Sequence, residues 1–180
     1  MQRLAEHSDE RVRWRRDALV FFLSATAGWA YEVLLYALDG KGWVNRGFLY
    51  GPYLPIYGFG AVLMLSALRR FDGQPDVVFL LGALLSGAVE WLTGEALWAL
   101  YGRRWWDYTG FPYQIRGFVC LHSILAFGVG GLILIYRVAP AVDRWLGRIP
   151  PRIADRLCLA MMALPAVDFL VTLCFRYPPG

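Results

Sequence analysis

Five ionisable side chains lie inside long apolar stretches of this sequence, where a charge is costly. They are Glu32, Glu90, Glu95, His122 and Asp168. A charged side chain near the centre of a bilayer costs about 2.5–3.5 kcal/mol on insertion scales, so such residues usually face protein or water and have partners. These residues could bind a proton, a cation or an amine. They could equally be structural groups that hold neighbouring loops.

The glutamates differ in their depth and in the cations near them. Glu32 and Glu95 each lie six residues before the end of an apolar segment, about 9 Å at the rise of a helix. Arg46 and Arg116 follow in the next connections, so structural pairing is the favoured interpretation for these two glutamates. Glu90 lies in the same segment as Glu95, about 16 Å from its end. It has no arginine near it in sequence, which favours a functional role.

The sequence gives little indication of a catalytic nucleophile or of a metal site. Cys120 and His122 are two residues apart, so on a helix they point in nearly opposite directions and cannot form a dyad. His122 could instead meet Glu90 or Glu95 across helices, although a packing histidine is the simpler interpretation. The cysteines show no disulfide or zinc spacing. We predict no catalytic residue, no metal site and no cofactor, and we favour a protein that is not an enzyme.

The composition indicates that these residues lie in membrane-spanning segments. The chain has 180 residues, of which 58% are hydrophobic and 18% charged, with a formal net charge of +4. Soluble domains average about 45–50% apolar and about 25% charged residues. The apolar excess falls in stretches long enough to cross a bilayer, which excludes a soluble enzyme, a disordered chain and a nucleic-acid-binding domain. The positive charge then indicates membrane topology and contact with lipid.

The apolar residues form five segments, over residues 18–38, 53–68, 77–101, 117–136 and 157–175. We therefore predict an all-α integral membrane protein with about five transmembrane helices. Residues 1–17 would be a basic cytoplasmic tail, residues 18–176 a single transmembrane domain, and residues 177–180 a short C-terminal tail. The start resembles a signal peptide, but its apolar run continues unbroken to Leu38, so we interpret it as an uncleaved helix.

The second segment is short and interrupted. Its 16 residues reach only about 24 Å as a helix, and Pro52, Pro55, Gly58 and Gly60 lie at its start. Interrupted membrane segments often mark a binding site, because their free backbone groups must face protein or water. A short helix in a locally thinned bilayer is the alternative.

Lysine and arginine are distributed unevenly between the two sides that five crossings would define. Twelve lie in the N-terminal tail and the second and fourth connections, and six lie on the other side. Because basic residues are enriched in cytoplasmic loops, we predict the N-terminus inside and the C-terminus outside.

Two loops on the predicted outer face look related. The pattern Trp-x-Asn-x-Gly-Phe starts at Trp43, and Trp-x-Asp-x-x-Gly-Phe starts at Trp105. The similarity suggests a parallel duplication of two helical hairpins, with a fifth helix added. Chance similarity between aromatic interfacial loops is the alternative. We expect the loops to meet at one outer mouth, formed by Asn45, Arg46, Trp106, Asp107 and Tyr108.

Four motifs carry a family resemblance. They are Gly28-Trp29-x-x-Glu32, then Asn45-Arg46-Gly47-Phe48-Leu49-x-Gly51-Pro52-x-x-Pro55-Ile56-Tyr57-Gly58-x-Gly60, then Trp105-Trp106-Asp107-Tyr108, and Gly117-x-x-Cys120-Leu121. Over about residues 28–140 the chain resembles the bacterial ABC-transporter type IV family of multipass membrane proteins. It departs from the family pattern at Thr109, Gln114 and Phe118, where serine, asparagine and arginine are expected. Arg116 is the available substitute for that arginine.

The resemblance implies a permease-like transport subunit in the bacterial inner membrane, with a site at the outer loops Trp43–Pro55 and Trp105–Gly117. Since the sequence has no nucleotide-binding motif, any ATPase would be a separate subunit. Membrane lipids and a homo-oligomer are the other expected partners, and nucleic acid is not. The alternatives are an enzyme acting on a lipid or envelope precursor, or an envelope-complex scaffold. The candidate site residues are Glu32, Asn45, Arg46, Tyr57, Glu90, Glu95, Trp106, Asp107, Tyr108, Arg116 and His122.

Overall fold

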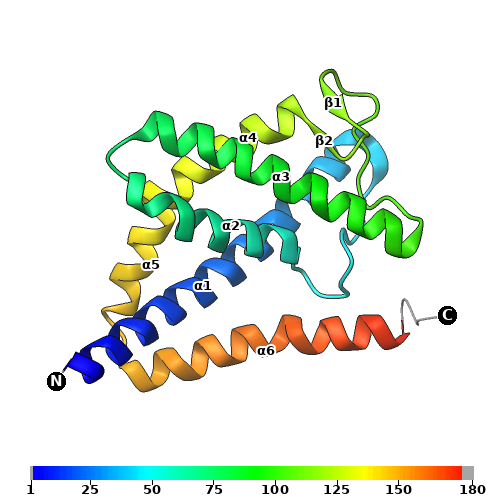
Figure 1. The fold of residues 1–180 in the computed structure, drawn as a ribbon. Helices are drawn as coiled ribbons and strands as arrows, with labels where there is room; N and C mark the ends of the chain where they lie inside the picture. The colour runs from blue at the N-terminus through cyan, green and yellow to red at the C-terminus, as the bar shows by residue number, and fades with distance from the viewer. Residues whose placement is uncertain (1, 176–180) are drawn as a thin grey trace. The chain divides into compact units, whose positions relative to one another are not determined.

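The protein is built almost entirely of helices (Figure 1). The structure is a computed structural model that describes the backbone of residues 2–175 and the side chains of residues 10–175. The α-helices are α1 (Gln2–Tyr36), α2 (Pro55–Leu68), α3 (Pro75–Tyr101), α4 (Leu121–Ile133), α5 (Ala139–Leu146) and α6 (Pro151–Phe175). Short helical turns are η1 (Ala37–Lys41), η2 (Arg69–Phe71) and η3 (Leu134–Val138), and the strands are β1 (Gln114–Ile115) and β2 (Val119–Cys120).

Four helical stretches of the described chain are long and apolar enough to cross a membrane. They are Glu10–Lys41, Pro75–Tyr101, Leu121–Leu146 and Pro151–Phe175. This confirms the prediction of an all-α membrane protein. The second apolar segment forms α2, whose 14 residues reach only about 21 Å across a hydrocarbon layer of about 30 Å. The number of crossings and the orientation of the termini therefore stay predictions.

The basic stretch before the first apolar segment is helical from Gln2 and continues without a break into that segment. The segment expected to be helical from residue 117 begins its helix at Leu121 instead. Cys120 is its N-cap, where its side chain accepts from the Ser123 amide and its own amide donates to Ser123 Oγ. This capping box fixes the start of α4.

The chain divides into two compact units, described separately below. Unit 1 comprises residues 1–59 and 140–180, and unit 2 comprises residues 60–139. In unit 1, α1 packs against α6, and Arg15 forms a two-pronged ion pair with Asp155. Arg15 Nε lies 2.7 Å from Oδ1, and Nη2 lies 3.1 Å from Oδ2. This charge pair fixes the register of the two helices.

In unit 2, α3 packs against α4 along a face of glycines. A Cβ on Gly82 would lie 3.9 Å from the Cα atoms of both Gly128 and Gly131. Small residues of this kind let two membrane helices approach closely.

A short antiparallel hairpin precedes α4, and the sequence did not predict it. Gln114 pairs with Cys120, and Ile115 pairs with Val119. The turn between the strands requires a left-handed backbone at Arg116 (φ 51°) and Gly117 (φ 73°). Glycine adopts that conformation without strain, and here it allows the tight turn.

Candidate functional site

Glu32 is the centre of a polar cluster in unit 1. The Tyr57 hydroxyl donates a hydrogen bond of 3.1 Å to Glu32 Oε1, and Arg46 Nε lies 3.6 Å from Oε2. Only 27% of the Glu32 side chain and 22% of the Arg46 side chain are exposed, so the pair is largely removed from solvent. Arg46 also lies over the ring of Tyr36, with Cζ 4.6 Å from its centroid. The structure thus forms the pairing that the sequence suggested for Glu32.

The motif Gly28-Trp29-x-x-Glu32 binds the segment that follows α1. Positions 28 and 32 are four apart and share one face of the helix, and Tyr57 lies against both of them. A Cβ on Gly28 would overlap the Tyr57 ring. On the next residue, Trp29 Nε1 donates to Asn45 Oδ1 over 2.6 Å. The motif residues therefore hold the loop and the start of α2 against α1.

The first loop is also held by α6. Asp168 accepts hydrogen bonds from the amides of Tyr50 (3.1 Å) and Gly51 (2.7 Å), and from Thr172 Oγ1 (3.2 Å). Asn45 Nδ2 closes the same loop on the Tyr50 carbonyl at 2.7 Å. Sequence reasoning noticed Asp168 as a buried charge but left it out of the site. Its available signal was a carboxylate four residues before Thr172 in the apolar part of this helix.

Glu90 is the centre of the deepest cluster in unit 2. The residue is 6% exposed. The Tyr108 hydroxyl donates to Oε1 over 2.8 Å, and the Ser123 hydroxyl donates to Oε2 over 2.8 Å. Ser123 was missed by sequence reasoning, because the N-cap of α4 at Cys120 was not predicted. A carboxylate contacted by two hydroxyl groups can hold a proton or face a cation without a change of backbone.

The loop after α3 is a closely bonded turn. Trp106 Nε1 donates to the Phe118 carbonyl at 2.8 Å, and the Tyr108 amide donates to the Gly117 carbonyl at 2.9 Å. Asp107 Oδ1 accepts from the Thr109 amide at 3.0 Å and from Arg104 Nη1 at 3.1 Å. The bond from the Thr109 amide, with a smaller contribution from Arg104, holds the pKa of Asp107 below its ordinary value.

Arg104 and Arg116 lie in the same loop region as Phe118, the position where the family pattern has an arginine. Arg116 Nη1 lies 3.0 Å from Glu95 Oε1, and 65% of the Arg116 side chain is exposed. Phe118, at the position of the expected arginine, is 2% exposed and its ring lies where a Cβ on Gly94 would be. Arg104 Cζ lies 4.7 Å from the Phe118 ring centroid. The ring belongs to the core of unit 2, and guanidinium groups reach this loop from positions 104 and 116.

His122 lies on the surface, apart from the carboxylates. Its ring stacks on Phe111, with centroids 6.4 Å apart and an interplanar angle of 30°. Among residues 10–175 no hydrogen bond or ion pair joins His122 to Glu90 or Glu95. The neighbouring Ser123 donates a hydrogen bond to the Glu90 carboxylate instead. The same part of the chain holds no group of three or more histidine, cysteine, aspartate or glutamate side chains able to bind a metal ion.

The sequence-predicted residues thus fall into two sets. Glu32, Asn45, Arg46 and Tyr57 meet in unit 1. The set in unit 2 comprises Glu90, Glu95, Trp106, Asp107, Tyr108, Arg116 and His122. Convergence of the two loops at one mouth remains a prediction.

Comparison with known families decides the assignment. The profile of the family described as "Putative ABC-transporter type IV" matches residues 19–173. The chain belongs to this family. The matched range includes every candidate site residue, and together with the apolar helices it indicates a transporter-like membrane protein. Searches of curated proteins and of solved structures find no match.

Proposed function

We propose that this ABC-transporter type IV protein is the permease-like membrane subunit of an ATP-driven transport system in the bacterial inner membrane. Its solute site would be formed by the outer loops Trp43–Pro55 and Trp105–Gly117 together with the glutamates beneath them. The family assignment supports transport, and the four apolar helices support a membrane subunit.

The observation that carries the site is the buried carboxylate of Glu90. It lies eleven residues before the end of α3, about 16 Å along the helix, and both of its oxygens accept from hydroxyl groups. Replacing a buried polar group by an apolar one of similar volume is often neutral or stabilising, so stability alone does not account for a carboxylate here. We infer that Glu90 faces a positively charged group of the solute, or a proton exchanged for it.

The rings around the cluster fit a cationic solute. Tyr108 reaches Glu90 through its hydroxyl, and its ring packs edge-on against Phe111 with centroids 5.7 Å apart. Aromatic faces attract ammonium and guanidinium groups, most strongly where water is excluded. A solute carrying an amine or guanidine is therefore the class that this cluster favours.

Energy for transport would come from a partner. The sequence contains no phosphate-binding loop, so the nucleotide would bind to a separate ATPase subunit. The basic connection between α4 and α6, over residues 137–156, is the candidate docking element.

The test is purification from the native bacterium in a mild detergent. The tagged protein is expressed at its normal level, and proteins that co-purify are identified by mass spectrometry. An unrelated multipass protein with the same tag is the control. We expect an ATPase subunit in the sample and not in the control. A sample without any ATPase, containing instead an envelope enzyme or scaffold, would contradict the proposal.

A further inference from the structure

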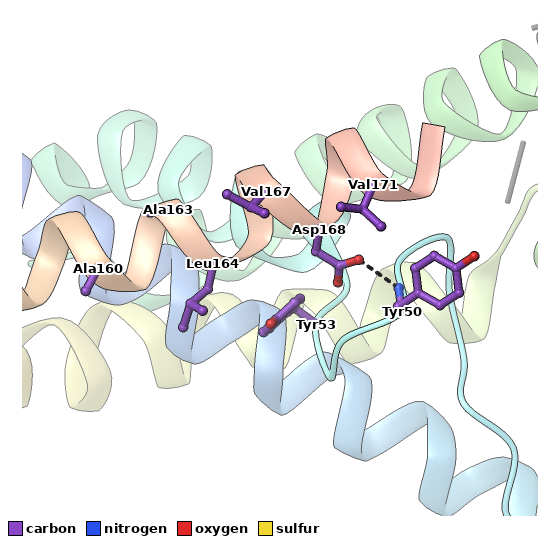
Figure 2. Close-up of a pocket in the computed structure, with 8 residues that line it drawn as sticks. All are labelled: Tyr50, Tyr53, Ala160, Ala163, Leu164, Val167, Asp168 and Val171. Carbon is purple, nitrogen blue, oxygen red and sulfur yellow. Dashed lines mark hydrogen bonds between the residues drawn. The ribbon is translucent and has the colours of Figure 1, made fainter. Parts of the chain in front are cut away.

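An apolar groove runs along α6 beside the first loop (Figure 2). Its volume is about 830 Å³, within the range of sites that hold small-molecule ligands. Six of its eight lining residues belong to α6, and the other two, Tyr50 and Tyr53, come from the loop. All of them lie in unit 1.

The body of the groove suits a hydrocarbon chain. Ala160, Ala163, Leu164 and Val167 line it with small and branched apolar side chains. Leu164 and Val167 are 55% and 58% exposed, and α6 is one of the helices able to cross a membrane. In a bilayer this surface would contact lipid rather than water.

Asp168 is the acidic residue in the lining of this apolar groove. Figure 2 shows the Asp168 carboxylate turned toward the loop, with a hydrogen bond to the Tyr50 amide. In residues 10–175, Asp168 accepts only from amides and a hydroxyl, and it forms no ion pair there. A carboxylate held by amides and a hydroxyl at the edge of an apolar surface favours the approach of a cationic group.

We expect Asp168 to lie near the depth of a lipid headgroup. Irregular backbone such as that of residues 50–53 is not found facing the hydrocarbon layer, because its free amides and carbonyls need partners. Asp168 is bonded directly to this backbone, so it lies at the level of the loop. Tyrosines such as Tyr50 and Tyr53 are enriched at that interfacial level.

We propose that this groove is a binding site for a phospholipid whose headgroup carries a primary ammonium, with the ammonium at Asp168 and an acyl chain along Ala160, Ala163 and Val167. A primary ammonium donates charge-assisted hydrogen bonds to a carboxylate, whereas a choline headgroup has no N–H to donate. A headgroup with net negative charge is repelled by Asp168. This site does not depend on the transport role, and either can fail without the other.

The test compares three lipids with identical acyl chains: phosphatidylethanolamine, phosphatidylcholine and phosphatidylglycerol. The purified protein in detergent is titrated with each lipid, and native mass spectrometry counts bound molecules. We expect phosphatidylethanolamine to bind about tenfold more tightly than the other two, the scale of one charge-assisted hydrogen bond. Equal retention of the three lipids, or a preference for phosphatidylglycerol, would overturn the proposal.

Three variants localise the binding. Asp168→Asn removes the charge, and Ala163→Trp fills the groove while leaving Asp168 and its loop bonds in place. Both should bind phosphatidylethanolamine about tenfold less tightly than the native protein. Leu159→Trp adds the same ring at an exposed position of α6 outside the groove and should bind like the native protein. Should Asp168→Asn fail to fold, native-like lipid binding by Ala163→Trp would still refute the site.

Discussion

The contacts around Glu32 require a residue without a side chain at position 28. Gly28, one helical turn before Glu32, leaves the space that the Tyr57 ring occupies, and the Tyr57 hydroxyl then reaches the carboxylate. Trp29 carries the second attachment, to Asn45. At the residue scale, the three motif residues therefore act differently: Gly28 makes room, Trp29 binds the loop, and Glu32 accepts a hydrogen bond.

The substitution Gly28→Ala should destabilise the protein. The added methyl group overlaps the Tyr57 ring, and overpacking of this kind costs about 1–3 kcal/mol. Denaturant unfolding of the purified protein in detergent measures the change. Gly130→Ala is the matched control in α4, since its Cβ would meet nothing within 4 Å and alanine favours a helix over glycine by about 1 kcal/mol. Equal stability of the two variants would show that the contact with Tyr57 is unimportant.

The two glutamate–arginine pairs should differ in strength. The side chains of the Glu32–Arg46 pair are 27% and 22% exposed, whereas Arg116 in the other pair is 65% exposed. We expect Glu32→Gln to lower the free energy of unfolding by about 1–3 kcal/mol, because it leaves a partly buried arginine charge. Glu95→Gln should change it by about 0–1 kcal/mol, as for an exposed pair. Unfolding in detergent distinguishes the two, and a larger loss from Glu95→Gln would contradict this ranking.

Some of these contacts could be predicted from the sequence and others could not. The pairs of Glu32 with Arg46 and of Glu95 with Arg116 were foreseeable, because each arginine follows its glutamate in the next connection. The structural role of Asp168 was not foreseeable. Its main partners are the backbone amides of Tyr50 and Gly51, which lie 118 and 117 residues away in the sequence. Nearly every residue has a backbone amide, so the residue types in the sequence do not show which amide a carboxylate will bind.

At the scale of elements, hydropathy predicted the helices but not the hairpin before α4. The strands β1 and β2 have two residues each, too few for an alternating pattern to be visible. Their position is set by the bonds of the loop, including the Gly117 amide to Gln114 Oε1 at 2.6 Å and the Leu121 amide to the Tyr113 carbonyl at 3.1 Å. Hydropathy also placed the start of α4 too early, because the buried residues Phe118 and Val119 are as apolar as a helix core.

The loop between α3 and β1 should depend on pH through Asp107. Its folded pKa lies below the ordinary value of about 3.9, so ionised Asp107 stabilises the loop above that pH. The contribution is lost as the pH falls through the lower, folded pKa. Asp107→Ala should therefore melt at a lower temperature than the native protein at pH 7, and the difference should shrink below about pH 4. A difference that stays constant from pH 7 to pH 3 would exclude this role.

At the scale of the whole molecule, topology depends on α2. Its 14 residues require a thinned bilayer or a small tilt to cross, which membranes tolerate at modest cost. If α2 crosses, five spans would place the termini on opposite sides, and from the twelve-to-six division of basic residues we predict the N-terminus in the cytoplasm.

Reporter fusions after Gly180 measure this topology in living cells. A reporter active only outside the cytoplasm should be active there, and a cytoplasm-only reporter should be silent. The same pair of reporters fused before Met1 should give the opposite result and serves as the control. Cytoplasmic activity at both ends would mean that α2 does not cross.

We propose that this protein couples a carboxylate site in the membrane to a partner ATPase. The most direct measurement is ATP hydrolysis by the co-purified complex in lipid nanodiscs, with the native protein and with Glu90→Gln. Couplings between two sites are commonly fivefold or more, so we predict that Glu90→Gln still assembles with the ATPase but lowers its turnover by about fivefold or more, while Glu95→Gln hydrolyses ATP at the native rate. Unchanged hydrolysis by an intact Glu90→Gln complex would contradict this coupling.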